Sequence, residues 1–177
     1  MATTFNAKLS IEALFNEIVQ SGNQKMGNLQ SRFQFIQDLP TGVLDNTINV
    51  GYAATATAIG ASTTTSYDLI GGLSSSTGTV INFDEVVLIA VRNRSSTAAN
   101  YLSVGPHAVN GFGVLAANVG FWNNAADRSI VPADSWTLWY SKGGVPAAAA
   151  STDVLAIITG AAAAAATWDI LILGRDN

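Results

Sequence analysis

The sequence contains no cysteine among its 177 residues. Without thiols, the chain has no disulfide framework, no thiolate metal ligand and no cysteine nucleophile. Histidine is nearly as scarce: the single one, His107, follows an expected strand in the stretch VGPHAVNG, and we interpret it as a loop residue. No G-x-S-x-G, H-E-x-x-H or P-loop pattern occurs. We therefore expect that the protein is not an enzyme and has no catalytic residue.

Charged side chains are also few, at 11% of the residues against roughly 25% in a typical soluble domain. Lysines and arginines are scattered singly, so no basic patch can follow a phosphate backbone, and we expect no nucleic-acid partner. No apolar run approaches the roughly 20 residues of a membrane-spanning helix. The N-terminus also lacks the features of a signal peptide. We expect no membrane partner, and synthesis in a cytoplasm.

The low charge has two interpretations. Hydrophobic residues make up 49% of the chain, which argues against disorder. The chain is then either an ordinary Thr- and Ala-rich β protein or a protein whose surface is covered by copies of itself or by a partner.

The acidic residues give only weak indications of a site. Asp84 and Glu85 precede an expected central strand, and Asp127, Asp134 and Asp153 lie in expected loops. Paired carboxylates are typical of glycosidases, and clustered aspartates with carbonyl groups can bind calcium. Because neither spacing resembles a known motif, we interpret these residues as ordinary turn residues. We expect no metal and no cofactor.

The first 46 residues differ from the rest, and we interpret them as an N-terminal arm or an outer pair of strands. Two patterns compete in FNAKLSIEALFNEIVQSG. A strand would place Leu9, Ile11, Ala13 and Phe15 at period two, whereas a helix would align Ile11, Leu14, Phe15 and Ile18. The pattern does not decide between them. The segment NLQSRFQFIQDLP alternates like a strand that stops at Pro40, and QSGNQKMGN between the two segments is rich in turn residues.

From residue 47 onward the pattern is β throughout. The expected strands lie within 48–59, 62–73, 83–93, 101–106, 129–141, 153–159 and 167–174. The pattern indicates a loop at 142–152, and at 110–128 either a loop throughout or a loop with one short strand. The run from Val86 to Val91 is apolar on both faces, which indicates a central strand. About 8–10 short strands without a crossover helix predict an all-β fold, a β-sandwich or jelly roll, over residues 47–177.

Two alanine runs test this interpretation. Ala161–Ala166 precedes the last expected strand, and Ala147–Ala150 lies in a loop. Isolated helices need about 12–15 residues even when they are rich in alanine. We therefore expect the longer run to be a hairpin connection whose last alanines belong to the strand, and the shorter run to be a loop.

Aromatic residues are the clearest candidates for contacts. Phe121 and Trp122 lie in a Gly/Asn loop, where we expect them to contact a partner. Trp136, Trp139 and Tyr140 lie on one expected strand, where Trp136 or Trp139 is expected to fill the core.

Four phrases in the span from about residue 65 to the end carry a resemblance: YDLIGGLSSSTGTVINFDEVVLIAVRN, STAANYLSVGPHAVNGF, IVPADSWTLWYS and TDVLAIITGAAAAAATWDILILG. In this order they resemble small structural proteins of tailed bacteriophages. The resemblance implies a virion component, most often a β-sandwich or jelly-roll decoration or cement protein on the capsid. It implies no active-site residue.

We therefore expect a capsid cement protein that binds between capsomers, with the major capsid protein and a second or third copy of itself as partners. A strand of the arm is expected to add to a neighbour's sheet edge. The alternatives are a tail or host-attachment component, which would contact its receptor through Phe121, Trp122 and Tyr140, and a carbohydrate-binding sandwich. The candidate interface residues are Phe5, Ile11, Phe15, Phe33, Phe35, Phe121 and Trp122.

Overall fold

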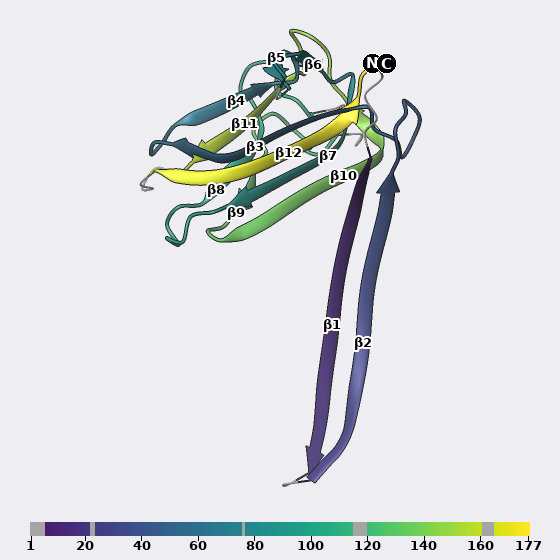
Figure 1. Cartoon of the computed structure of the whole chain (residues 1–177). Coiled ribbons are helices and arrows are strands. Elements are labelled where there is room, and N and C mark those ends of the chain that lie inside the picture. The colour runs from purple at the N-terminus through teal and green to yellow at the C-terminus, as the bar shows by residue number, and fades with distance from the viewer. Residues whose placement is uncertain (1–5, 22–23, 76, 115–119, 161–164) are drawn as a thin grey trace.

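The structure is a computed structural model that describes residues 6–21, 24–75, 77–114, 120–160 and 165–177, with side chains except at 13–33 and 59. These ranges contain twelve β-strands and no helix (Figure 1). The strands are β1 (Ala7–Ser21), β2 (Gln24–Leu39), β3 (Val50–Ile59), β4 (Thr64–Asp68), β5 (Ile70–Ser74), β6 (Val80–Asn82), β7 (Glu85–Asn93), β8 (Leu102–Pro106), β9 (Ser129–Val131), β10 (Ser135–Pro146), β11 (Val154–Thr159) and β12 (Ala166–Arg175).

The fold is an all-β sandwich, as the sequence predicts. One four-stranded sheet has the order β10-β7-β12-β3 and the other has the order β4-β11-β8-β9, while β5 and β6 form a small sheet of their own. Neighbouring strands in these sheets pair antiparallel. The prediction that 83–93 contains a central strand is confirmed, because β7 pairs on both sides, with β10 and with β12.

The main core lies between the two four-stranded sheets. Ile89 of β7 and Ile172 of β12 meet Val104 and Ile157 of the opposite sheet, and all four are fully buried. Trp168 fills the same layer from β12. Apolar residues that alternate along each strand supply this layer, because successive side chains point to opposite faces.

A hydrogen bond inside the core joins the two sheets. The Trp168 indole N–H donates to the Tyr67 hydroxyl at 3.0 Å, and Tyr67 belongs to β4 of the opposite sheet. Burial raises the pKa of Tyr67 to about 12, since the phenolate would lose its water. The polar atoms of both rings therefore have a partner inside an apolar layer.

β1 and β2 form a long hairpin that projects from the sandwich (Figure 1). Its register runs from Ala7↔Leu39 at the root to Ser21↔Gln24 at the far end. The strand alternative for the first segment is therefore correct, because the second segment supplies its antiparallel partner. β2 ends at Leu39, directly before Pro40, which has no N–H to continue the ladder. The strands also extend further into the segment 20–28 than its turn residues suggest.

Three expectations about the strands need correction. β11 and β12 do not form a hairpin, because they lie in opposite sheets, so the chain crosses the sandwich between them. The expected loop 142–152 is in part strand, since β10 continues to Pro146 after a register shift between Tyr140 and Val145. The segment 62–73 divides into β4 and β5 around buried Leu69. The ten strands after the hairpin, β3–β12, agree with the 8–10 expected for the sandwich.

The alanine runs agree with the sequence where the structure describes them. Ala166 begins β12, and Ala147–Ala150 forms a loop and turn. Residues 161–164 lie outside the described part of the chain.

Candidate interaction surface

A second apolar cluster lies on the outer face of the β10-β7-β12-β3 sheet. Leu39 and Ile48, from the hairpin root and the loop after it, pack there against Val87, Leu88 and Leu173. All five side chains are at least 92% buried. The root of the hairpin is therefore part of a packed core, although its far end projects away from the sandwich (Figure 1).

Tyr140 connects this cluster to both the hairpin and the loop. Its hydroxyl donates to the Asn46 side-chain oxygen at 2.9 Å, and its ring meets that of Phe35 edge to face, with centroids 6.4 Å apart. Burial raises the pKa of Tyr140. These contacts set the direction in which the hairpin leaves the sheet.

Arg175, at the end of β12, holds the loop that follows β2. Its side chain is 1% exposed, and its guanidinium donates to the Leu44 carbonyl at 2.7 Å and to the Gly143 carbonyl. The end of β12, the loop after β2 and the irregular part of β10 are thus joined at one buried cation. Gly144 makes this approach possible, because a Cβ there would lie 2.5 Å from the Arg175 nitrogen.

Beyond the hairpin root, the outer face of the sheet stays apolar but uncovered. The register aligns Leu138, Ala90, Leu171 and Ala53 across the four strands. Leu138 is 37% exposed and Leu171 is 36% exposed, whereas Ile170 and Ile172 on either side of Leu171 point into the core. We call this row, together with Trp136 beside it, the outer apolar face.

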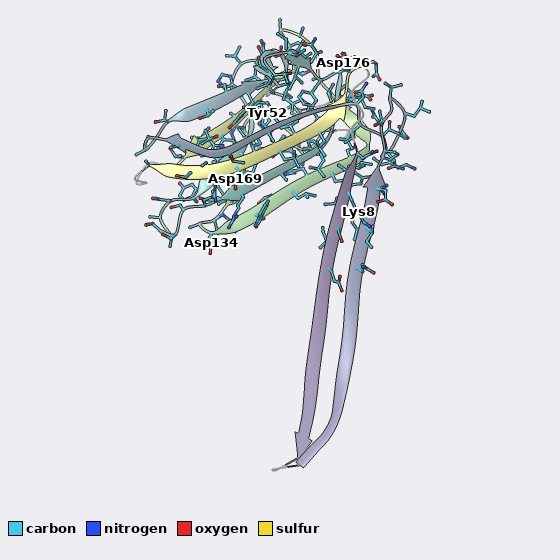
Figure 2. The ribbon with its side chains drawn as sticks, in the orientation of Figure 1. Lys8, Tyr52, Asp134, Asp169 and Asp176 are labelled. Atoms are coloured by element: carbon cyan, nitrogen blue, oxygen red, sulfur yellow. The ribbon has the colours of Figure 1, made fainter. Side chains whose placement is uncertain are left out.

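Trp136 is the most exposed aromatic residue of this face, at 66%. The Arg92 guanidinium lies 5.4 Å from the centre of its ring, which is within the range of a cation–π contact. In the same region, Arg94 pairs with Asp169 at 3.3 Å, and Figure 2 shows Asp169 on this sheet. The charges bordering the outer apolar face therefore already have contacts within the chain.

A shallow groove of about 210 Å³ separates the hairpin root from the sheet. Ala7, Lys8, Leu9 and Leu39 line it on the hairpin side, and Leu88, Ala90, Leu138, Leu171 and Leu173 line it on the sheet side. Lys8 marks the hairpin side in Figure 2. A groove with eight apolar residues and one lysine suits an apolar side chain of a partner better than a polar small molecule.

The described part of the hairpin itself carries exposed apolar residues. Ile11 pairs with Phe35 in the register, and their exposed fractions are 45% and 38%. Ile36, on the opposite face of the ribbon, is 45% exposed. Two neighbouring strands with such residues on both faces are typical of a segment that a partner covers.

The predicted interface residues divide into three groups. The structure brings Ile11 and Phe35 together on the exposed hairpin, although nothing in it shows a partner in contact with them. Phe15 and Phe33 belong to β1 and β2, but their side chains lie outside the described part, as does all of Phe5.

The expectation that Trp122 is a contact residue is wrong, because Trp122 is 6% exposed and belongs to the main core. Its loop folds back onto the sandwich, so its ring lies over Gly113, where a Cβ would come within 2.7 Å. Its indole N–H donates to the Ser129 hydroxyl at 3.3 Å. Phe121 is half-buried against the same core and meets Trp122 edge to face.

Sequence reasoning missed Trp136. We expected Trp136 or Trp139 to fill the core, and only Trp139 packs against it. The signal was present, since Trp136, Leu138 and Tyr140 alternate with Trp139 along one strand. What the alternation could not tell is which of the two sets faces the core.

Asp127 and His107, two polar residues that we expected in loops, bond to nearby backbone groups. Asp127 accepts backbone N–H bonds from Asn123 and Asn124, and the His107 ring bonds only to the backbone of Val109. No group of three or more metal-ligating side chains occurs among the residues described, and no helix there is long and apolar enough to cross a membrane.

Comparison with protein-family models, curated proteins and solved structures gives no match in any of the three.

Proposed function

We propose that this chain is a structural protein of a bacteriophage virion, a decoration or cement protein that binds between capsomers on the capsid. The observation that carries the proposal is the β1–β2 hairpin, which projects from the sandwich (Figure 1) and carries exposed Ile11 and Phe35. The sequence resemblance supports the assignment to a phage virion. The hairpin is long enough to reach a neighbouring subunit, which supports binding between capsomers.

The hairpin supports a role in assembly because a free two-stranded ribbon is marginally stable in water. β1 has 15 residues, which at roughly 3.3 Å each gives a reach of about 50 Å. The described side chains at residues 7–12 and 34–38 of the hairpin are exposed or half-buried. The hairpin becomes stable when a neighbour covers one of its faces or pairs with one of its open edges.

The energy of such a contact is sufficient for stable binding to a capsid when many copies bind together. Burial of one exposed Leu, Ile or Phe side chain contributes about 1.5–3 kcal/mol. The loss of translational and rotational freedom offsets much of the gain at a single contact. A symmetric shell repeats the contact many times, and a linked arm raises the effective concentration of each one.

The experiment compares phage particles assembled with and without this chain, by cryo-EM and by heat-induced disassembly. We expect density for the sandwich between capsomers and a lower disassembly temperature when the chain is absent. The double variant Ile11→Asp/Phe35→Asp should lose particle binding. Its control is Ile130→Asp on β9, since Ile130 is 53% exposed but lies on the other sheet.

Particles that withstand heat equally well without the chain would contradict cementing. Density confined to the tail would contradict the capsid position and assign the chain to the tail or to host attachment.

A further inference from the structure

We infer that two copies of this chain exchange their hairpins, so that the ribbon of each copy lies on the outer apolar face of the other. The inference refines the self-association within the proposed function by naming the two surfaces that meet. It rests on one relationship: the chain has an uncovered apolar ribbon and an uncovered apolar sheet face, and they do not cover each other.

The contact cannot close within one chain. Leu39 and Phe35 reach the sheet at the hairpin root, where they meet Leu173 and Tyr140 respectively. From there the ribbon leads away from the sheet (Figure 1), and Ile11 remains exposed. The row of Leu138 and Leu171 stays uncovered for the same reason.

The hairpin root shows how such a ribbon fits the sheet. Leu9 and Leu39 of the root already lie against Leu88 and Leu173. The next row of the sheet, with Leu138 and Leu171, continues the same surface without a cover. A second ribbon of the same chain can therefore lie beside the first, where it meets a surface of the kind that the first already covers.

The area favours a reciprocal contact over a one-sided one. Two strands are roughly 10 Å wide, and the part of β12 that the hairpin root leaves uncovered, residues 166–171, extends about 20 Å, so a ribbon covers about 200 Å² of the sheet. Exchange between two copies creates four such patches, about 800 Å² in total, which is the size of a weak, reversible interface of less than about 1,200 Å². A one-sided contact gives half of this. A two-fold axis is the simplest symmetry that makes both contacts identical.

Strand addition at the sheet edge fits less well. β3 is an edge strand of this sheet, but its ladder shifts register opposite Trp168 and Ile170. Ala56 at the shift has φ 51° and donates its N–H to the Asp169 carboxylate. A bulge of this kind disfavours edge-to-edge pairing at β3, and the other edge strand, β10, is interrupted by the register shift between Tyr140 and Val145. We therefore infer that the face rather than an edge is the receptor.

The absence of cysteine makes a clean cross-linking test possible, because a single introduced thiol has no native competitor. Full-length Ile11→Cys protein is mixed with full-length Leu171→Cys protein and oxidised. The same mixture is made with Phe35→Cys and Leu138→Cys. The control replaces the sheet variant by Ile130→Cys, which is exposed on β9 of the other sheet.

We expect a disulfide-linked heterodimer from the hairpin and sheet variants, in clear excess over the Ile130→Cys control. Light scattering of the unmodified protein should give the mass of two copies. A monomer in solution would overturn the inference, and so would linking to Ile130 as efficient as to Leu171 and Leu138.

A second variant tests the energy of the contact. Leu171→Glu adds a charge to a side chain that is partly exposed in one copy, so the fold should tolerate it, as circular dichroism will check. The dimer dissociation constant should rise at least about 30-fold. An unchanged constant would contradict the exchange. These measurements use free protein and are independent of the capsid experiment. A chain that does not dimerise can still bind the capsid, and a chain that does not bind the capsid can still dimerise.

Discussion

The Arg175 guanidinium donates from Nε to the Glu85 carboxylate at 2.6 Å, and the Arg175 side chain is 1% exposed while that of Glu85 is 29% exposed. The pair joins the end of β12 to the start of β7. Through its other nitrogens Arg175 also binds the carbonyl groups of Leu44 and Gly143. One buried cation thus organises the region from which the hairpin projects.

Replacing Arg175 by Met should lower the free energy of unfolding by about 3 kcal/mol, because it leaves Glu85 and two carbonyl groups without their partner. Urea unfolding followed by tryptophan fluorescence measures the change. The matched control is Arg94→Gln, which removes a more exposed ion pair with Asp169 and should cost less than about 1 kcal/mol. Equal losses for the two variants would show that Arg175 is not the anchor described here.

The stability of the sandwich should fall at alkaline pH because of Tyr67. Its pKa is raised from 10.0 to about 12 in the folded chain, so the folded state holds the phenolic proton more tightly than the unfolded state. This contribution is complete below pH 10 and is lost as the pH rises through about 12, a change of about 3 kcal/mol. Urea midpoints measured across this range test the prediction.

Tyr67→Phe is the control for the alkaline effect. The variant should be less stable at neutral pH, because the Trp168 indole N–H loses its acceptor, but its stability should decline less between pH 10 and 12. A wild-type decline no steeper than that of the variant would assign the alkaline effect to other groups, such as Tyr140, whose pKa is also raised.

Asn93 should be among the most sensitive polar positions. Its side chain is fully buried, and its amide donates to the carbonyl groups of Asn100 and Val131 at 2.7 and 3.1 Å. Asn93→Ala leaves these buried groups unpaired and should cost about 3 kcal/mol. Asn123→Ala, in an exposed loop, should change stability by less than about 0.5 kcal/mol. Thermal unfolding by circular dichroism measures both, and a tolerant Asn93 would contradict the assigned bonds.

Leu39→Ala should loosen the hairpin as well as lower stability. Leu39 is 1% exposed in the cluster beneath the root, and its truncation should cost about 2–5 kcal/mol. Tryptic cleavage after Lys25 or Arg32, both in β2, should accelerate more than in Leu102→Ala, which removes a leucine of the main core. Equal acceleration in the two variants would mean that Leu39 acts only on global stability.

Much of the sandwich could be predicted from local pattern alone. Residues 86–91 indicate a central strand because they are apolar on both faces, and β7 does pair on both sides. Pro40 marks the end of β2 because proline cannot donate to a ladder. The choice between strand and helix at Leu9–Ile18 could not be made locally. It depends on β2, whose pairing with β1 only the folded hairpin reveals.

The connection between β11 and β12 could not be predicted for a related reason. Two adjacent strands with a short link are most often a hairpin, but here each strand finds a better apolar surface in a different sheet. Which sheet a strand joins is decided by contacts between distant residues. A pattern of period two carries no information about them.

The contact residues show the same limit. Trp122 lies in a polar loop, yet that loop folds back and buries it, whereas Trp136 lies on a regular strand and is exposed. Ile11 and Phe35, predicted from the sequence as interface residues of the arm, are exposed on the hairpin, and their contact with a partner stays a prediction. Sequence reasoning could not identify the outer apolar face. Leu171 lies in an apolar run, and only the folded sheet shows that its side chain points away from the core.

The position of β12 has a consequence for how this protein is made. β12 is the last strand of the sequence, yet it pairs with β7 on one side and β3 on the other, and Ala166 meets Ile59 across more than 100 intervening residues. Closing such a long loop is slow. Until β12 has been synthesised and has paired, β3 and β7 each have an unpaired edge that promotes aggregation. Aggregation of the incomplete chain should therefore limit the yield in a producing cell, and a low growth temperature, which weakens hydrophobic association, should favour intact product.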